Sequence, residues 1–108
     1  MKPEFENIPL NINETNKRFE LEYNGHLAFI NYGEFGKSIA LVHTEAEPEL
    51  KGTGAASALV EKTLTHLKEE GKEILPYCPY VFAYIKRHPE WKEIVNPQFP
   101  GYNQINAQ

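Results

Sequence analysis

Apolar and charged side chains alternate between residues 17 and 23, where Phe19 and Leu21 stand among Arg and Glu. This period of two is typical of a half-buried β-strand. The pair Asn24-Gly25 follows directly and suits the tight turn of a two-residue hairpin. We therefore expect an antiparallel return strand over residues 26–32.

A second turn is predicted at residues 33–36, leading to a strand over residues 37–44. The centre of that strand, residues 39–42, is apolar on both faces, which favours an interior position in a sheet. Residues 1–16 hold Pro and Asn without a sustained period, so we expect an irregular arm with a short extended piece near Ile12.

The pattern then changes to that of an amphipathic helix ending near Gly71. Its apolar face consists of Ala56, Leu59, Val60, Thr63, Leu64 and Leu67. A short strand over residues 73–77 and a helix over residues 80–88 follow, while the uncharged segment 96–108 predicts a loose tail.

The order β-β-β-α-β-α predicts an α/β (α+β) domain with helices packed on a mixed sheet. It contains an antiparallel meander, a central helix crossover and a C-terminal helix. A chain of 108 residues has room for one core. We expect an arm at residues 1–16, a domain at 17–95 and a tail at 96–108.

Composition narrows the function. All 15 acidic residues are Glu, which disfavours EF-hand loops, Mg²⁺-dependent phosphoryl transfer and Ser-His-Asp triads. The net charge of −4, without a basic cluster, argues against a nucleic-acid partner.

The single cysteine, Cys78, excludes an internal disulfide and fits a reducing compartment. We find no secretory signal, and the longest apolar run, residues 80–85, is too short to span a bilayer. We therefore expect a cytoplasmic protein without a membrane partner. The four histidines lack metal-ligand spacing, so no metal is expected, and nothing in the sequence indicates an oligomeric state.

The segment 47–56 joins a predicted buried strand to a predicted helix. Gly52 and Gly54, separated by one residue, allow successive backbone N–H groups to point into one concavity at the helix N-terminus. This segment is either a phosphate-binding loop or a plain glycine turn that caps the helix. The P-loop is set aside because Lys51 precedes the glycines, and the dinucleotide fingerprint because no acidic residue ends the following strand.

The stretch from Glu49 to Ala55 resembles the pyrophosphate-binding motif of the GNAT acetyltransferases, Gln/Arg-x-x-Gly-x-Gly/Ala. More narrowly, the chain is similar to the small stand-alone GNAT-like family. The matching stretches are residues 18–21, 43–45, 52–54, 76–81 and 88–91. The resemblance covers residues 17–95 and implies a minimal GNAT-like fold.

The resemblance also implies acetyl-coenzyme A (acetyl-CoA) as cosubstrate. The backbone N–H groups expected to hold its pyrophosphate belong to Leu50, Lys51, Gly52, Thr53, Gly54 and Ala55. The pantetheine arm is expected where the strand at Leu41 and Val42 splays from the strand at residues 74–75, with Tyr80 also at the coenzyme site. The acid Glu49 stands where the superfamily has Gln or Arg, so modest affinity is expected.

Cys78, at the start of the second helix, is a candidate catalytic residue, because a helix N-terminus favours a thiolate. It forms an acetyl intermediate, lines the thioester site, or is simply a buried small side chain. His43 and Glu45 are candidate bases, expected to point toward the strand that carries Cys78. Tyr84 resembles the family's tyrosine acid, and Tyr80 is its rival.

The resulting expectation is an acetyltransferase acting on an unidentified small-molecule or peptide amine. The alternative is a non-catalytic acyl-CoA-binding or regulatory module, because the short chain offers little to hold an acceptor. A thiol-based redox protein is a third possibility, but no resolving cysteine is present.

Overall fold

A computed structural model describes residues 1–106 and contains one five-stranded sheet in the order β1-β2-β3-β4-β5. The strands are β1 (Asn11–Asn13), β2 (Arg18–Tyr23), β3 (His26–Phe35), β4 (Ser38–Ala46) and β5 (Glu73–Pro76). The α-helices are α1 (Ala55–Glu69) and α2 (Pro79–Arg87), accompanied by short 3-10 turns at Pro3–Phe5, Pro48–Leu50, Pro89–Ile94 and Tyr102–Gln104.

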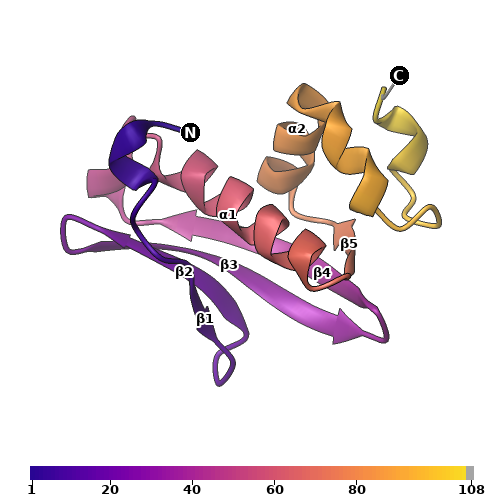
Figure 1. Ribbon diagram of the computed structural model, residues 1–108, viewed down its shortest axis with the longest axis horizontal. Helices are drawn as coiled ribbons and strands as arrows, with labels where there is room; N and C mark the ends of the chain where they lie inside the picture. Colours follow the sequence, from indigo (N-terminus) through magenta and orange to yellow (C-terminus); the bar gives the residue numbers. More distant parts are fainter. Residues whose placement is uncertain (107–108) are drawn as a thin grey trace.

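The first four strands pair antiparallel, and β5 pairs parallel with β4 after the crossover through α1. Both helices lie on one face of the sheet and leave the other face open (Figure 1). The expected mixed α/β architecture is therefore confirmed. No helix within residues 1–106 combines the length and the apolar character that crossing a membrane requires.

The core lies between the sheet and α1. The predicted apolar face of α1 is buried at Leu59, Val60 and Leu64, as its period requires. On the sheet side, Phe19 of β2 stacks on Tyr32 of β3 with ring centroids 4.5 Å apart. The side of the sheet that carries these rings is called the helix side below.

The predicted turn at residues 33–36 is wrong. β3 continues to Phe35, and the reversal takes place at Gly36, whose positive φ of 62° suits glycine. The two glycines of this segment favoured a longer turn, but Gly33 has a regular partner, Ala40, on β4.

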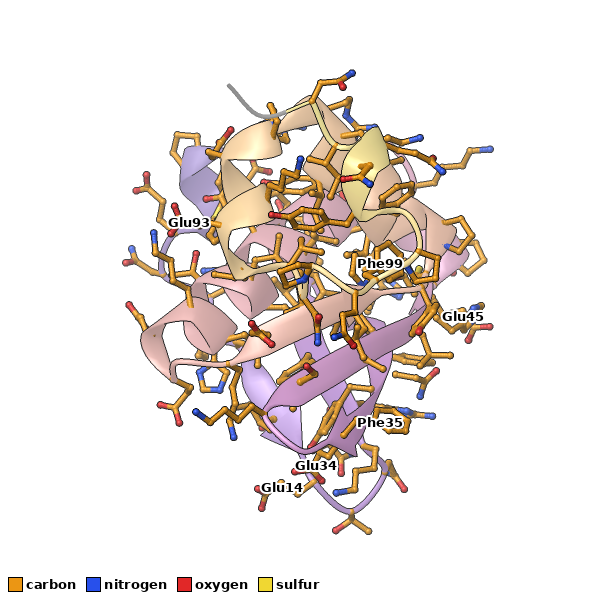
Figure 2. The ribbon with its side chains drawn as sticks, turned by 90° about the vertical axis from the view of Figure 1, so that its right-hand side faces the viewer. Glu14, Glu34, Phe35, Glu45, Glu93 and Phe99 are labelled. Atoms are coloured by element: carbon orange, nitrogen blue, oxygen red, sulfur yellow. The ribbon has the colours of Figure 1, made fainter. Side chains whose placement is uncertain are left out.

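Residues 96–106 are packed, whereas a loose tail was expected over residues 96–108, and residues 107 and 108 lie outside those that the structure describes. The N–H of Asn96 donates to the carbonyl of Ile74 at 2.9 Å, so the segment covers the outer edge of β5. Phe99 and Ile105 are buried, and Figure 2 shows Phe99 between this segment and the sheet. Covering an exposed strand edge explains why a weakly patterned segment is ordered.

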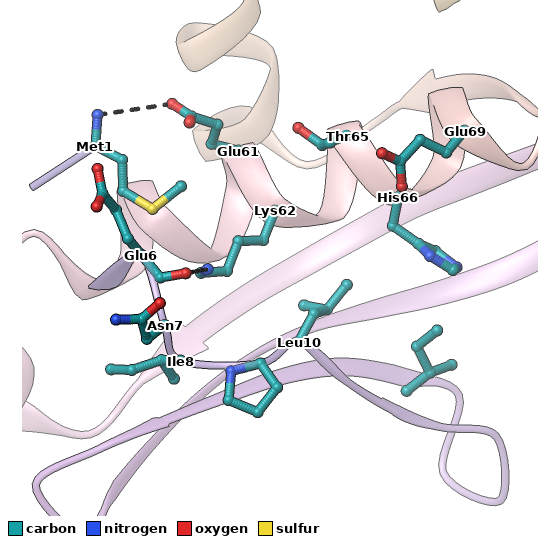
Figure 3. Close-up of a pocket in the computed structure, with 12 residues that line it drawn as sticks. Met1, Glu6, Asn7, Ile8, Leu10, Glu61, Lys62, Thr65, His66 and Glu69 are labelled. Atoms are coloured by element: carbon teal, nitrogen blue, oxygen red, sulfur yellow. Dashed lines mark hydrogen bonds and ion pairs between the residues drawn. The ribbon is translucent and has the colours of Figure 1, made fainter. Parts of the chain in front are cut away.

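The N-terminal arm is also anchored. Phe5 is fully buried, with its ring centroid 4.7 Å from that of Tyr23. The expected extended piece forms as β1, and the arm runs beside α1 (Figure 3), where Lys62 donates to the carbonyl of Glu6 at 3.5 Å.

Candidate active site

The strands β4 and β5 separate half-way along β4. Their parallel register ends at the pair Leu41 and Pro76. Just beyond it, the N–H of Cys78 donates to the carbonyl of Leu41 at 2.8 Å. From His43 to Ala46, β4 pairs only with β3. The two strands therefore form a fork, and Cys78 stands at its apex.

Cys78 immediately precedes α2 and is only 3% exposed. Its Sγ lies 3.2 Å from Oγ1 of Thr44, within hydrogen-bonding reach across the fork. Sequence reasoning missed Thr44, although its place between two candidate bases on one strand was visible. The cysteine thus faces a hydroxyl inside the fork.

A β-bulge at Val42 decides which side chains of β4 enter the fork. Asn31 of β3 pairs with His43 and Tyr32 pairs with Leu41, so Val42 has no partner on β3. The extra residue shifts the alternation of side chains along β4 by one position.

His43 and Glu45 consequently face away from the helices. Their partners on β3 are Asn31 and Phe29, whereas Thr44 pairs with Ile30, which is fully buried on the helix side. The expectation that His43 and Glu45 point toward the strand carrying Cys78 is therefore wrong. Uninterrupted alternation from Leu41 would have placed them there, and the bulge prevents it.

His43 and Glu45 form a pair on the open face of the sheet. His43 Nε2 lies 3.3 Å from Glu45 Oε1, and the two side chains are 57% and 63% exposed. Figure 2 shows Glu45 projecting at the margin of the molecule. The pair is accessible from the side of the sheet opposite to α1 and α2.

The loop before α1 is built around two glycines with positive φ, Gly52 at 78° and Gly54 at 91°. Thr53 closes it: its hydroxyl donates to the carbonyl of Leu50 at 2.6 Å and accepts from the N–H of Ala55 at 3.1 Å. Four of the six backbone donors expected to hold pyrophosphate are therefore already bonded within the loop. They belong to Leu50, Lys51, Thr53 and Ala55.

The free donors lie beside them. In the described part of the chain, the N–H groups of Gly52, Gly54, Ala56 and Ser57 donate to no protein acceptor. Unsatisfied first-turn donors are the usual anion-binding groups of a helix. All four of these residues line one cavity of about 530 Å³, together with Lys2, Lys51 and Tyr80.

Glu49, the acid that raised doubt about a phosphate site, is not among the residues lining this cavity. Its Oε1 lies 3.7 Å from Nδ1 of His26 on β3. Glu47 accepts from His26 at 3.1 Å and from the N–H of Leu27 at 2.7 Å. These two bonds, that from His26 first, lower the pKa of Glu47.

His26, Glu47 and Glu49 are also the one group of residues in 1–106 whose ligand atoms gather within 4.8 Å as a metal ion would require. No spacing in the sequence indicated this group, because His26, at the start of β3, is far along the chain from Glu47 and Glu49, which follow β4. Glu47 is already held by the two hydrogen bonds described above, so the group has a structural explanation as it stands.

The two candidate tyrosines differ in their surroundings. Tyr84 is 5% exposed and its hydroxyl donates to Glu61 of α1 at 3.1 Å. Burial, and then the negative charge of Glu61, raise the pKa of Tyr84 well above its usual range. Tyr80 is 39% exposed and lines the loop cavity.

A separate cavity of about 480 Å³ lies between the arm and α1 (Figure 3). Ile8 and Leu10 line one side of it, and Lys62 and His66 line the other. It contains none of the residues predicted to act in catalysis or in coenzyme binding.

A sequence model of a GCN5-related N-acetyltransferase family matches residues 18–94, which is most of the chain. The chain belongs to this family. The expected GNAT resemblance is confirmed, and acetyl transfer is the general activity of the family. The fork, Thr44, Cys78 and the glycine loop of this GNAT domain all fall inside the match, whereas Lys2 lies outside it.

Proposed function

We propose that the protein transfers an acetyl group from acetyl-CoA to an amine. One observation carries the proposal most directly: four residues whose N–H groups have no protein acceptor within residues 1–106 line a single cavity at the start of α1. A diphosphate is the part of coenzyme A that such donors and a helix dipole favour.

The fork would hold the rest of the coenzyme. Beyond Val42, one edge of β4 pairs with β3. Among residues 1–106, no strand pairs with the backbone groups on its other edge. The two amides of a pantetheine arm can pair with such an edge as an added strand does. From the loop cavity, an arm following β4 would bring the thioester toward Thr44 and Cys78.

Two routes of transfer fit these residues. In the direct route, His43 or Glu45 removes a proton from the ammonium form of the acceptor, and the amine nitrogen attacks the thioester carbonyl. The C–S bond then breaks, the amide nitrogen loses its remaining extra proton to solvent, and the coenzyme thiolate takes a proton, with Tyr80 as the favoured donor over Tyr84, whose hydroxyl is held by Glu61. The open face of the sheet is the side from which the acceptor would approach this pair.

In the covalent route, the Cys78 thiolate attacks the thioester, releases coenzyme A and carries the acetyl group until the amine displaces it. The hydroxyl of Thr44, 3.2 Å from Sγ, would donate to that thiolate. The buried position of Cys78 requires the acetyl group to enter through the fork.

Calorimetry with acetyl-CoA tests the binding step. We expect saturable binding to the wild-type protein, with an affinity that depends on ionic strength because phosphates are bound. Absence of binding at millimolar ligand would refute the proposal. A matched variant, Ser57→Pro, removes one unsatisfied N–H at a first-turn position that tolerates proline and should weaken binding.

Intact mass after incubation with acetyl-CoA separates the two routes. The covalent route predicts one added acetyl group in the wild type and none in Cys78→Ala. A label that persists in Cys78→Ala excludes Cys78 as the nucleophile. Turnover without any label instead favours direct transfer, in which case His43→Ala and Glu45→Ala should identify the base.

The limited exposure of Cys78, 3%, favours one alternative: a module that binds acyl-CoA without transferring the acyl group. A screen of small amines and peptides for release of free coenzyme A thiol distinguishes the two. An enzyme releases thiol in proportion to acceptor, whereas a binding module releases none with any acceptor. The single cysteine still favours a reducing compartment, and we propose the cytoplasm.

A further inference from the structure

Lys2 lies against the glycine loop although it is far away in the sequence. Its Nζ donates to the carbonyl of Thr53 at 2.8 Å. Its side-chain stem covers Gly54, since a Cβ built on that glycine would stand 3.3 Å from Cε of Lys2. Lys2 also lines the same cavity as the four residues with unsatisfied N–H groups.

The position of Lys2 is fixed by the fold of the arm. The N–H of Phe5 donates to the carbonyl of Lys2 at 3.1 Å, and Phe5 itself is fully buried. Glu4, in the same turn, accepts from the hydroxyl of Tyr23 at 2.7 Å. The anchored turn therefore delivers this lysine to the loop, whereas a freely moving arm would not.

Lys2 brings positive charge and hydrogen-bond donors to the cavity. Lys2 and Lys51 are the cationic side chains that line it among residues 1–106, and Glu47 contributes an opposing carboxylate. An ammonium group has three donors. With one of them on the carbonyl of Thr53, two remain for phosphate oxygens.

We propose that Lys2 is a phosphate-binding residue of the coenzyme site, supplied by the arm from outside the matched family domain. This inference rests on the proposed function, because it assigns a role within the same acetyl-CoA site. Lys2 would select acyl donors that carry phosphate, such as acetyl-CoA, over acetyl-pantetheine, which has none. It would act in binding and leave the chemical step unchanged.

The test compares variants of the full chain by calorimetry with acetyl-CoA. Lys2→Gln should raise the Kd about fivefold at low salt, the loss expected for one charge-assisted contact, and should reduce the salt dependence of the Kd. Lys2→Arg keeps the charge and should remain within about twofold of the wild type. The matched control is Lys62→Gln, which removes a lysine that contacts the same arm but not the loop.

The outcomes separate this inference from the proposed function. If the wild type binds no acetyl-CoA, the proposed function fails. If the wild type binds and Lys2→Gln binds equally well, only the role of Lys2 fails. An equal loss in Lys62→Gln would also overturn it, because Lys2 would then act merely by placing the arm.

Discussion

The hydroxyl of Thr44 lies 3.2 Å from Sγ of Cys78, the candidate nucleophile. We expect Thr44→Val, which keeps the shape and removes the hydroxyl, to slow alkylation of Cys78 by iodoacetamide about fivefold, because the thiolate loses a hydrogen-bond donor worth about 1 kcal/mol. The measurement is the rate of mass gain, with Thr44→Ser as the control that keeps the hydroxyl. Equal rates in all three proteins would contradict the contact.

Removing the hydroxyl of Tyr84 and removing that of Tyr80 should affect stability differently. Tyr84→Phe should lower the free energy of unfolding by about 1 kcal/mol, because the hydrogen bond from this buried side chain to Glu61 is lost. Tyr80→Phe should change the free energy of unfolding by no more than about 0.5 kcal/mol, as is usual for an exposed group. Urea denaturation measures both, and turnover of each variant then shows which hydroxyl protonates the coenzyme thiolate.

The position of Cys78 relative to α2 was predictable from the sequence, whereas the direction in which other candidate side chains point was not. Cys78 does precede a helix, as its neighbour Pro79 indicated. The facing of His43 and Glu45 could not be predicted, because a bulge shifts the alternation and leaves no pattern in the sequence. The place of Lys2 was equally hidden, since it depends on a tertiary anchor at Phe5.

At the scale of elements, the loop-to-α1 junction depends on Gly54. Its φ of 91° is strained for any other residue, and an added Cβ also meets Lys2. We expect Gly54→Ala to lower the free energy of unfolding by about 2 kcal/mol. Gly52→Ala has a similar φ of 78° but open space around its Cβ, so it should cost less. Equal losses in urea denaturation would show that strain alone matters.

Acid stability reports on the junction between β4 and the loop. The folded pKa of Glu47 lies below its usual value of 4.5. Its stabilising contribution is therefore complete above that usual value and is lost as the pH falls through the folded pKa. Unfolding midpoints measured in urea from pH 7 to pH 3 should fall less for Glu47→Gln than for the wild type. Identical pH slopes would contradict this role.

Strands and helices with a clear hydrophobic period were predictable, whereas the residues at which their pairing stops were not. The apolar faces of β2 and α1 follow from periods of two and 3.6, because burial of one face dictates both. The fork between β4 and β5 was expected at Leu41 and Val42 from the family resemblance alone, because no period in the sequence predicts it. It depends on where a parallel ladder stops, and residues 39–42 are apolar on both sides of that point.

At the scale of the molecule, residues outside the family domain complete its core. Ile105 is 1% exposed. We expect Ile105→Ala to lower the free energy of unfolding by about 3 kcal/mol. The matched control is Ile12→Ala, because Ile12 is 38% exposed. This control should change the free energy of unfolding by no more than about 0.5 kcal/mol. Equal effects in urea denaturation would show that the C-terminal segment contributes no core.

The whole-molecule architecture followed from the order of elements, but the role of the two ends did not. Phe5, Phe99 and Ile105 are isolated apolar residues among polar neighbours, so no window of sequence marks them as buried. Their burial comes from surfaces that exist only once the sheet and helices have assembled.

Because Val42 is the extra residue of the bulge, the pairing of β4 with β3 does not require it. The strand halves on either side pair in register with β3, so deleting Val42 would join them into regular alternation without turning any side chain over. Thr44 would still face Cys78, and His43 would still face outward. The Val42 deletion would therefore remove the bulge while keeping the direction of the neighbouring side chains. It would show whether the bend that the bulge introduces in β4 keeps β4 and β5 apart.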